Sequence, residues 1–272
     1  MTALEAASPD LTTGWETTLP PEDTELRRFV LAWSEYLAGP VQALGGRVVR
    51  TPDALTTDLG RPASYWTSAV LLRPPAPDRW DVVLDGVERT LFRDGTGRVH
   101  LWSAWPTPDL TARGWELEGH PPLLFRPPGG PLPPDGTDLS VREVADEEEL
   151  ATWERVVVHG YPMPDLMPWR PGALFTDAVR SSGLRLWTGY ADGEAVAAAG
   201  SYVALGLHVL AIGVVLPHAR ARGYWRTLLR TRLEAYPDLP SASLFSDMSR
   251  PGAQRHGFWP ISRFTLWTRE RG

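Results

Sequence analysis

The residue types and spacing best suited to chemistry lie in one segment, residues 215–229. It consists of the end of an apolar strand, a short basic turn with one glycine, and the first turns of a helix. Such a turn directs several backbone N–H groups and the positive end of the helix dipole at one point, and its arginines add flexible cations. The segment therefore predicts a site for a di- or triphosphate.

Composition limits the partners of such a site. The chain has 272 residues, a formal net charge of −6 and no cysteine. The negative charge argues against general binding to nucleic acid or to a membrane surface, and the lack of cysteine excludes a disulfide framework and a cysteine nucleophile. No His or acidic cluster has metal-ligand spacing, so we predict no metal. No apolar run approaches the ~18 residues of a membrane span, and residues 1–20 lack a signal pattern, so we expect a cytoplasmic protein without a membrane partner.

A stretch rich in proline and glycine, residues 127–137, divides the chain. Its other residues are one Leu, one Asp and one Thr, a composition that forms neither a helix nor a paired strand. We therefore predict a linker here. The expected parts are a flexible N-terminus (1–20), a first domain (21–126) and a second domain (138–272).

The second half must position the basic turn, and its apolar pattern alternates between strands and helices. A capping box formed by Asp146 and Glu149 begins the first helix, which ends near Gly160. Three runs separated by turn residues predict an antiparallel meander that leads directly into the turn. The predicted elements are strand 139–144, helix 147–160, strands 184–190, 195–203 and 207–215, a helix after the turn, strand 241–246, helix 250–256 and a final strand 261–267.

The first half repeats part of this order. Helical spacing from Leu26 to Leu37 is followed by a strand (65–72), a helix (80–91) and strands at 99–105 and 123–126. The loop at 73–79, however, contains three prolines and no glycine. Each proline removes an N–H donor, so this loop cannot cradle a pyrophosphate. We predict a partial, degenerate copy of the same fold with a structural role.

The turn motif Arg220-x-x-Gly223 resembles the cofactor segment of the GCN5-related N-acetyltransferases (GNAT), whose pattern is Arg/Gln-x-x-Gly-x-Gly/Ala. The segments at 156–164, 246–251, 256–258 and 263–267 also resemble this family, as does the order of the elements, and the likeness spans residues 139 to 270. It implies an α/β (α+β) GNAT fold, with a mixed, mostly antiparallel central sheet flanked by helices. A GNAT-like α/β domain, partial and degenerate, would precede it.

The resemblance also implies a co-substrate, acetyl-CoA. In the family, the fourth strand splays from the fifth and the pantetheine arm lies between them as a pseudo-strand. Backbone groups of Gly213, Val214 and Val215 would take that role here, and Ser246 stands where the family often has an Asn that contacts pantetheine. The pyrophosphate contacts would come from Arg220, Ala221, Arg222, Gly223, Tyr224, Trp225 and Arg226.

Two residues depart from the family pattern. Trp225 stands where the pattern has Gly or Ala, and its indole either turns toward the neighbouring strand or fills the phosphate site. Ala253 stands where family members often have a Tyr that protonates the leaving thiolate. Candidates for that role are Tyr161, Asp247 and Ser249, followed by His159, Tyr224 and His256. Three of them also have a structural interpretation: His159 as a C-terminal helix cap, Tyr161 as a core contact and Asp247 as the start of the next helix.

Three hypotheses for function follow. The first is an acetyl-CoA-dependent N-acetyltransferase acting on a primary amine of a small molecule or peptide, by direct attack in a ternary complex because no cysteine can form an acyl-enzyme. The second is a GNAT-like pseudoenzyme that binds CoA or a protein partner without catalysis. The third has the fold retained for forming a homodimer.

Overall fold

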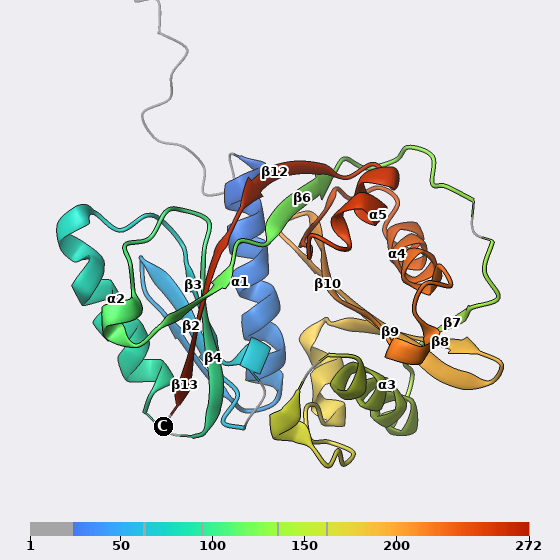
Figure 1. Cartoon of the computed structure of the whole chain (residues 1–272), viewed down its shortest axis with the longest axis horizontal. Helices are drawn as coiled ribbons and strands as arrows, with labels where there is room; N and C mark the ends of the chain where they lie inside the picture. Colours follow the sequence, from blue (N-terminus) through green and yellow to red (C-terminus); the bar gives the residue numbers. More distant parts are fainter. Residues whose placement is uncertain (1–23, 62–63, 94, 135, 162, 272) are drawn as a thin grey trace, which may run out of the picture.

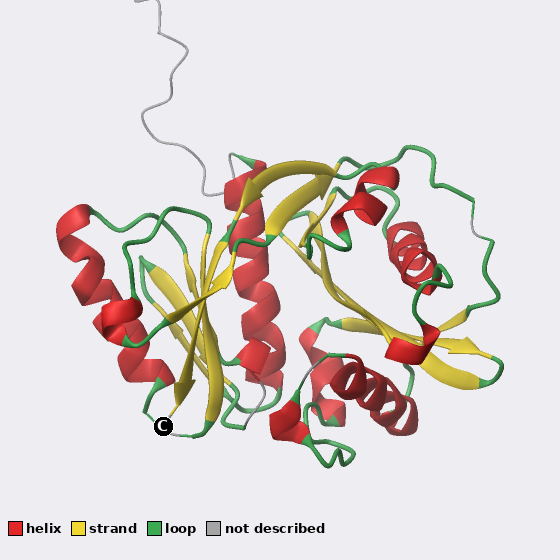
Figure 2. Ribbon diagram, viewed as in Figure 1, coloured by secondary structure: helices red, strands yellow, loops and turns green. Residues whose placement is uncertain are grey.

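The computed structural model of the chain describes residues 24–61, 64–93, 95–134, 136–161 and 163–271. The predicted flexible N-terminus, 1–20, lies outside the described residues. The described chain forms two mixed sheets with helices on their faces (Figures 1 and 2). In each sheet, one strand pair is parallel and the others are antiparallel. This confirms the predicted α+β class.

The first sheet contains β1 (Arg47–Arg50), β2 (Ala54–Asp58), β3 (Ser68–Leu71), β4 (Gly97–Ser103), β5 (Glu116–Gly119) and β13 (Thr265–Arg271). Its strand order is β1-β2-β3-β4-β13-β5. The second sheet contains β6 (Pro122–Arg126), β7 (Ser140–Glu143), β8 (Arg185–Ala191), β9 (Glu194–Ala204), β10 (Leu207–Val215), β11 (Ser241–Leu244) and β12 (Trp259–Arg263). Its order is β12-β6-β11-β10-β9-β8-β7.

Helices cover the faces of both sheets. The longer ones are α1 (Glu25–Ala43), α2 (Trp80–Leu91), α3 (Glu147–Gly160), α4 (Tyr224–Ala235) and α5 (Arg250–Arg255). The 3₁₀ turns are η1 (Ser64–Trp66), η2 (Pro77–Arg79), η3 (Thr111–Arg113), η4 (Pro164–Leu166), η5 (Asp177–Ser182) and η6 (Pro217–Ala219). The predicted cap of α3 is confirmed, since the Asp146 side chain accepts from the Glu149 N–H at 2.8 Å.

The two halves of the chain exchange their last strands. β6 precedes the linker but pairs with β11 and β12, whereas β13 returns to pair with β4 and β5. The prediction of one final strand at 261–267 in the second sheet is therefore wrong. Between β12 and β13, the fully buried Phe264 donates its N–H to Pro121 O at 3.0 Å, so the two crossing segments run side by side. Each sheet is thus completed by the other half.

The sequence predicted neither β1 and β2 nor the 3₁₀ turns η4 and η5 after α3. The signal for β2 is weak because it buries polar side chains, Thr56, Thr57 and Asp58. Asp58 is paired with Arg271 of the exchanged strand β13 at 3.3 Å. The carboxylate accepts a hydrogen bond from a residue 213 positions away in the sequence, and no local sequence pattern indicates such a partner.

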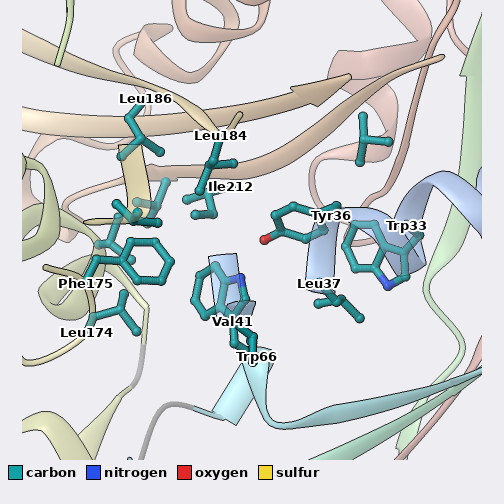
Figure 3. Packing of buried hydrophobic residues seen from close by; sticks show 14 of the residues in the cluster. Trp33, Tyr36, Leu37, Val41, Trp66, Leu174, Phe175, Leu184, Leu186 and Ile212 are labelled. Carbon is teal, nitrogen blue, oxygen red and sulfur yellow. The ribbon is translucent and has the colours of Figure 1, made fainter. Parts of the chain in front are cut away.

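Helix α1 stands between the two sheets (Figure 1) and packs on both. Its buried Trp33, Tyr36 and Leu37 belong to one core cluster with residues of the second half such as Phe175 and Ile212. In Figure 3, the Tyr36 hydroxyl points from α1 toward the side where Ile212 lies. The hydrophobic core is therefore continuous across the two halves.

Candidate functional site

A cleft of about 1140 Å³ lies between the two halves. On one side it is lined by β10, β11 and the turn that leads into α4. On the other side it is lined by α1, η1 and β4, with Trp33, Tyr36, Tyr65, Trp66 and Trp102 as their aromatic residues. The strand exchange holds these two walls together, so the cleft is a product of both halves.

Strands β10 and β11 separate inside this cleft. They pair only at His208–Ser241 and Val209–Ala242, although β10 continues to Val215. On its other side, β10 pairs with β9 with a register shift between Leu210 and Gly213. The last six residues of β10 therefore line the cleft without backbone pairing to β11, although the Ser243 side chain of β11 donates to Leu210 O at 2.6 Å. This is the separation that the GNAT resemblance implies.

The turn after β10 presents free backbone donors. Ala221 (φ 66°) and Gly223 (φ 88°) are left-handed, and α4 begins directly afterwards. Among the described residues, the N–H groups of 221–225 donate no hydrogen bond, whereas that of Arg226 donates to Gly223 O at 2.8 Å. Left-handed residues in such a turn gather N–H groups into a concave anion site, which the helix dipole reinforces. The turn fits a pyrophosphate.

Arg220 is exposed, but its guanidinium bonds to two backbone carbonyls near the turn. Its Nε donates to Val215 O at 3.0 Å and its Nη2 to Gly160 O at 3.1 Å. The guanidinium therefore links the turn to the end of β10 and to the end of α3. A ligand that approaches the edge of β10 at Val215 meets this side chain first.

The Tyr161 hydroxyl covers the edge of β10 at Gly213, two residues before Val215. It accepts from the Gly213 N–H and donates to Gly213 O, each at 3.2 Å. Burial raises the pKa of Tyr161, although the Gly213 hydrogen bond and Arg232 oppose this shift. The phenol is thus a neutral proton donor beside the bulged part of β10.

The indole of Trp225 lies close to Gly213 of β10 and to Gly252 of α5. A Cβ placed on Gly213 would lie 3.5 Å from its Nε1, and one placed on Gly252 would lie 2.8 Å from its ring. Its ring centre is 6.3 Å from that of Phe245, just after β11. Trp225 therefore bridges from β10 to α5 across the separated strands.

The other predicted acid or base candidates are engaged away from Gly213. Asp247 pairs with Arg263 at 2.9 Å, and this contact holds the pKa of the carboxyl below its ordinary value. Ser246 and Ser249 lie at the edge of the cleft and bond to each other at 3.0 Å. Tyr224 is buried in the core beneath the turn.

The two histidine candidates bond to backbone carbonyls of their own helices. His159 Nδ1 contacts Arg155 O, and His256 Nδ1 contacts Gly252 O, each at 2.8 Å. Neither lines the cleft. Of the residues predicted as acid or base, Tyr161 is the one that contacts Gly213 in the described chain.

Sequence reasoning missed two phenols that the first half contributes. Tyr36 of α1 and Tyr65 of η1 both line the cleft, and the rings of Tyr65 and Tyr161 are 6.1 Å apart. Burial raises the pKa of Tyr65 to about 12 and also raises that of Tyr36. Tyr36 follows Trp33 at helical spacing, which indicated only a buried face. Nothing local could indicate that this face meets β10.

Over the described ranges, no group of three or more His, Asp or Glu side chains is arranged to hold a metal ion. None of the helices in the described part of the chain has the length and apolar character needed to cross a membrane.

The chain has the GNAT fold. A GCN5-related N-acetyltransferase from Kribbella flavida aligns over 87% of this chain and 95% of its own, with 18% identity and a TM-score of 0.61. A putative GNAT acetyltransferase from Novosphingobium aromaticivorans covers the same shares, with 18% identity and a TM-score of 0.54. A GCN5-related N-acetyltransferase from Sphaerobacter thermophilus covers 89% and 93%, with 13% identity and a TM-score of 0.51. No protein-family model matches the sequence, and neither does any curated protein.

Proposed function

We propose that the chain is an acetyl-CoA-dependent N-acetyltransferase that acylates a primary amine in the cleft between its halves. One observation carries the proposal: the edge of β10 that β11 leaves unpaired and the free N–H groups of residues 221–225 face the same cleft. The turn suits a pyrophosphate and the edge suits an extended amide-bearing arm. The first half supplies the opposite wall, where an acceptor would lie.

The mechanism we propose is direct attack in a ternary complex. The amine nitrogen bonds to the thioester carbonyl carbon and the C–S bond breaks. The nitrogen gives up one proton and the departing sulfur receives one, so an amide and the CoA thiol form and the proton donor is restored. Positioning of two substrates in one cleft supplies much of the rate of such a reaction. The Gly213 N–H, once Tyr161 releases it, would donate to the oxygen on which negative charge develops. Tyr161 is then free to donate its proton to the sulfur.

A second function, ligand binding without catalysis, is favoured by the side chains on the edge of β10. Tyr161 satisfies both backbone groups of Gly213, Arg220 bonds to Val215 O, and Trp225 lies across the separated strands. An acyl donor must displace the first two contacts and move the indole. In a pseudoenzyme, Tyr161 would keep its contacts with Gly213 while the ligand binds, so the Gly213 N–H would not be released for a reaction.

Binding and thiol release separate the two functions. We expect acetyl-CoA to raise the melting temperature of the wild type, because a ligand that binds only the folded state stabilises it. Release of CoA is then followed with a thiol reagent across a panel of amines, and the absence of cysteine removes any background from the protein. Binding without thiol release would support the second function.

The Trp225→Gly variant tests the covered edge, with Trp259→Gly as its control. Trp259 is 61% exposed and does not line the cleft. Stabilisation by acetyl-CoA in Trp225→Gly but not in the wild type or the control would mean that the indole occupies the donor site. If millimolar acetyl-CoA stabilises neither the wild type nor Trp225→Gly, both proposed functions are wrong.

A further inference from the structure

Arg232 of α4 is a buried cation without an acidic partner. Its side chain lines the cleft although the residue is only 2% exposed. Within the described chain it forms no ion pair, and its hydrogen bonds there all go to backbone carbonyls. Nη1 donates to Ile212 O at 2.8 Å and to Gly200 O at 3.3 Å, and Nε donates to Leu228 O at 3.2 Å. Burying a charge in this way is costly in free energy, and this cost points to a role for the charge.

The Ile212 carbonyl, which Arg232 Nη1 binds, belongs to the same peptide unit as the Gly213 N–H. In a trans peptide, these two groups point in opposite directions. Arg232 Nη1 therefore holds one end of the unit, and the Tyr161 oxygen accepts from the other end at 3.2 Å. A cation bonded to the carbonyl oxygen polarises the amide and makes its N–H a stronger donor, as in other chains of hydrogen bonds in a medium of low dielectric.

We propose that Arg232 polarises the Ile212–Gly213 peptide so that the Gly213 N–H stabilises a negatively charged oxygen in the cleft. This inference rests on the proposed function in one respect: during turnover, the oxygen is that of the tetrahedral intermediate. Arg232 acts through the peptide and not on the reacting atoms, so it is a positioning residue.

Tyr161 provides a readout that needs no substrate. When its phenol ionises, a negatively charged oxygen lies next to the Gly213 N–H, as the intermediate would. Among the described residues, the charged or titratable groups near Tyr161 are Tyr36 of α1, Tyr65 of η1 and Arg232 of α4, and Arg220 of the turn bonds to O of the neighbouring Gly160. Removal of the Arg232 charge should therefore make Tyr161 harder to ionise.

The experiment is a pH titration of protein labelled with 3-fluorotyrosine, followed by ¹⁹F NMR. The Tyr161 signal is assigned by its loss in Tyr161→Phe. In Arg232→Gln, which keeps an N–H donor but no charge, we expect the ionisation constant of Tyr161 to fall by about 10-fold. Arg232→Lys keeps the charge and should stay close to wild type. Arg230→Gln, on the exposed side of the same helix, is the matched control.

The same variants are compared in turnover. For Arg232→Gln we expect kcat to fall by about 10-fold or more while the affinity for acetyl-CoA changes by less than about 2-fold, because the effect arises in the transition state. Should Arg232→Gln fail to fold, Arg232→Met removes the charge with an apolar chain and carries the same test.

An unchanged Tyr161 titration in a folded, uncharged variant would overturn the proposal. An equal shift in Arg232→Lys and Arg232→Gln would also overturn it, because it would indicate a purely structural role for the hydrogen bonds. If the wild type acylates no amine but Tyr161 titrates as expected, the proposed function fails and the polarised peptide stands.

Discussion

Two loops occupy corresponding places in the two sheets: the loop from β3 to α2 and the turn from β10 to α4. Each follows the first strand of its sheet's single parallel pair and precedes a helix of 12 residues. In the first half, the four-residue β3 pairs with β4 at three positions, so almost no strand extends beyond the pairing. In the second half, the nine-residue β10 pairs with β11 at only two. The spare length of β10 creates the cleft edge.

The two loops also differ in their backbone groups and charges. In the first loop, Arg73 and Arg79 both bind Asp53, at 2.7 and 3.1 Å, and three prolines remove donors. In the second, the N–H groups of 221–225 are free among the described residues. The same strand order thus supports a closed structural loop in one half and a potential anion site in the other. Capacity for a ligand depends on strand length and turn chemistry, not on the fold alone.

The largest expected effect comes from separating the two halves. Fragments cut within the linker, 1–131 and 132–272, should each fail to fold, because each lacks the strand that completes its sheet. Mixing them should restore a cooperative unfolding transition. Circular dichroism and thermal melts of each fragment and of the mixture measure this, with the intact chain as control. Cooperative unfolding of either fragment alone would contradict the expectation.

The next effect concerns His208, which lies where the parallel pairing of β10 and β11 begins. Burial, together with Arg232 and Arg185, lowers its pKa to about 3. The unfolded chain binds this proton near pH 6.5 and the folded chain does not, so the stability is full above about pH 6.5 and falls as the pH decreases toward 3. The expected slope is at most about 1.4 kcal/mol per pH unit.

Denaturant unfolding between pH 7 and 4 tests this slope. In His208→Gln the contribution of this residue should disappear, and in the control, His159→Gln, it should remain because His159 is exposed. An equal pH dependence in the wild type and in His208→Gln would show that His208 is not the group responsible.

A smaller effect is expected for Gly223→Ala in the second loop. Left-handed backbone costs an alanine roughly 1–2 kcal/mol, and the added Cβ would lie 2.8 Å from the Arg226 guanidinium. The affinity for acetyl-CoA should fall by about 10-fold as the turn distorts. Isothermal titration calorimetry measures it. Gly206→Ala, which has φ 66° and open space around it, carries the same strain outside the cleft and should bind normally.

The smallest effect is expected in the first loop. Asp53→Asn weakens the contacts to Arg73 and Arg79, which are half exposed, so the free energy of unfolding should fall by only about 1 kcal/mol. Acetyl-CoA affinity should not change, because this loop holds no ligand. Weaker binding in Asp53→Asn would remove the functional contrast between the two loops. Glu35→Gln, which weakens an exposed pair with Arg50, is the control for stability.

Local patterns predicted most helices and strands of the second half, together with α1 and α2. Their periodicity and caps, such as Asp146 on α3, report on neighbours within a few residues. The same reasoning assigned the final strand to the wrong sheet and did not predict β1 or β2. In both cases the deciding partners, β4 for the final strand and Arg271 for β2, lie far away in the sequence.

For the candidate site, the turn after β10 and the choice of Tyr161 as a candidate proton donor could be predicted from the sequence. The positions of Arg220 and Trp225 could not, because a side chain at the edge of a turn can face solvent or fold inward at a similar local cost. Tyr36 and Arg232 were missed because a buried helical face looks the same in sequence whether it meets a core or a cleft. Tyr65 was missed because the sequence predicted the start of a strand where the structure has η1.

The sequence by itself determined the elements, the GNAT resemblance and the difference between a proline-rich loop and a turn rich in free amides, because these depend on each residue and its near neighbours. Only the tertiary structure decided which half completes which sheet, that the edge of β10 is covered by Tyr161 and Arg220, and that Arg232 holds the far end of the Gly213 peptide. Those contacts form only when distant segments pack together, and burial then sets their strength.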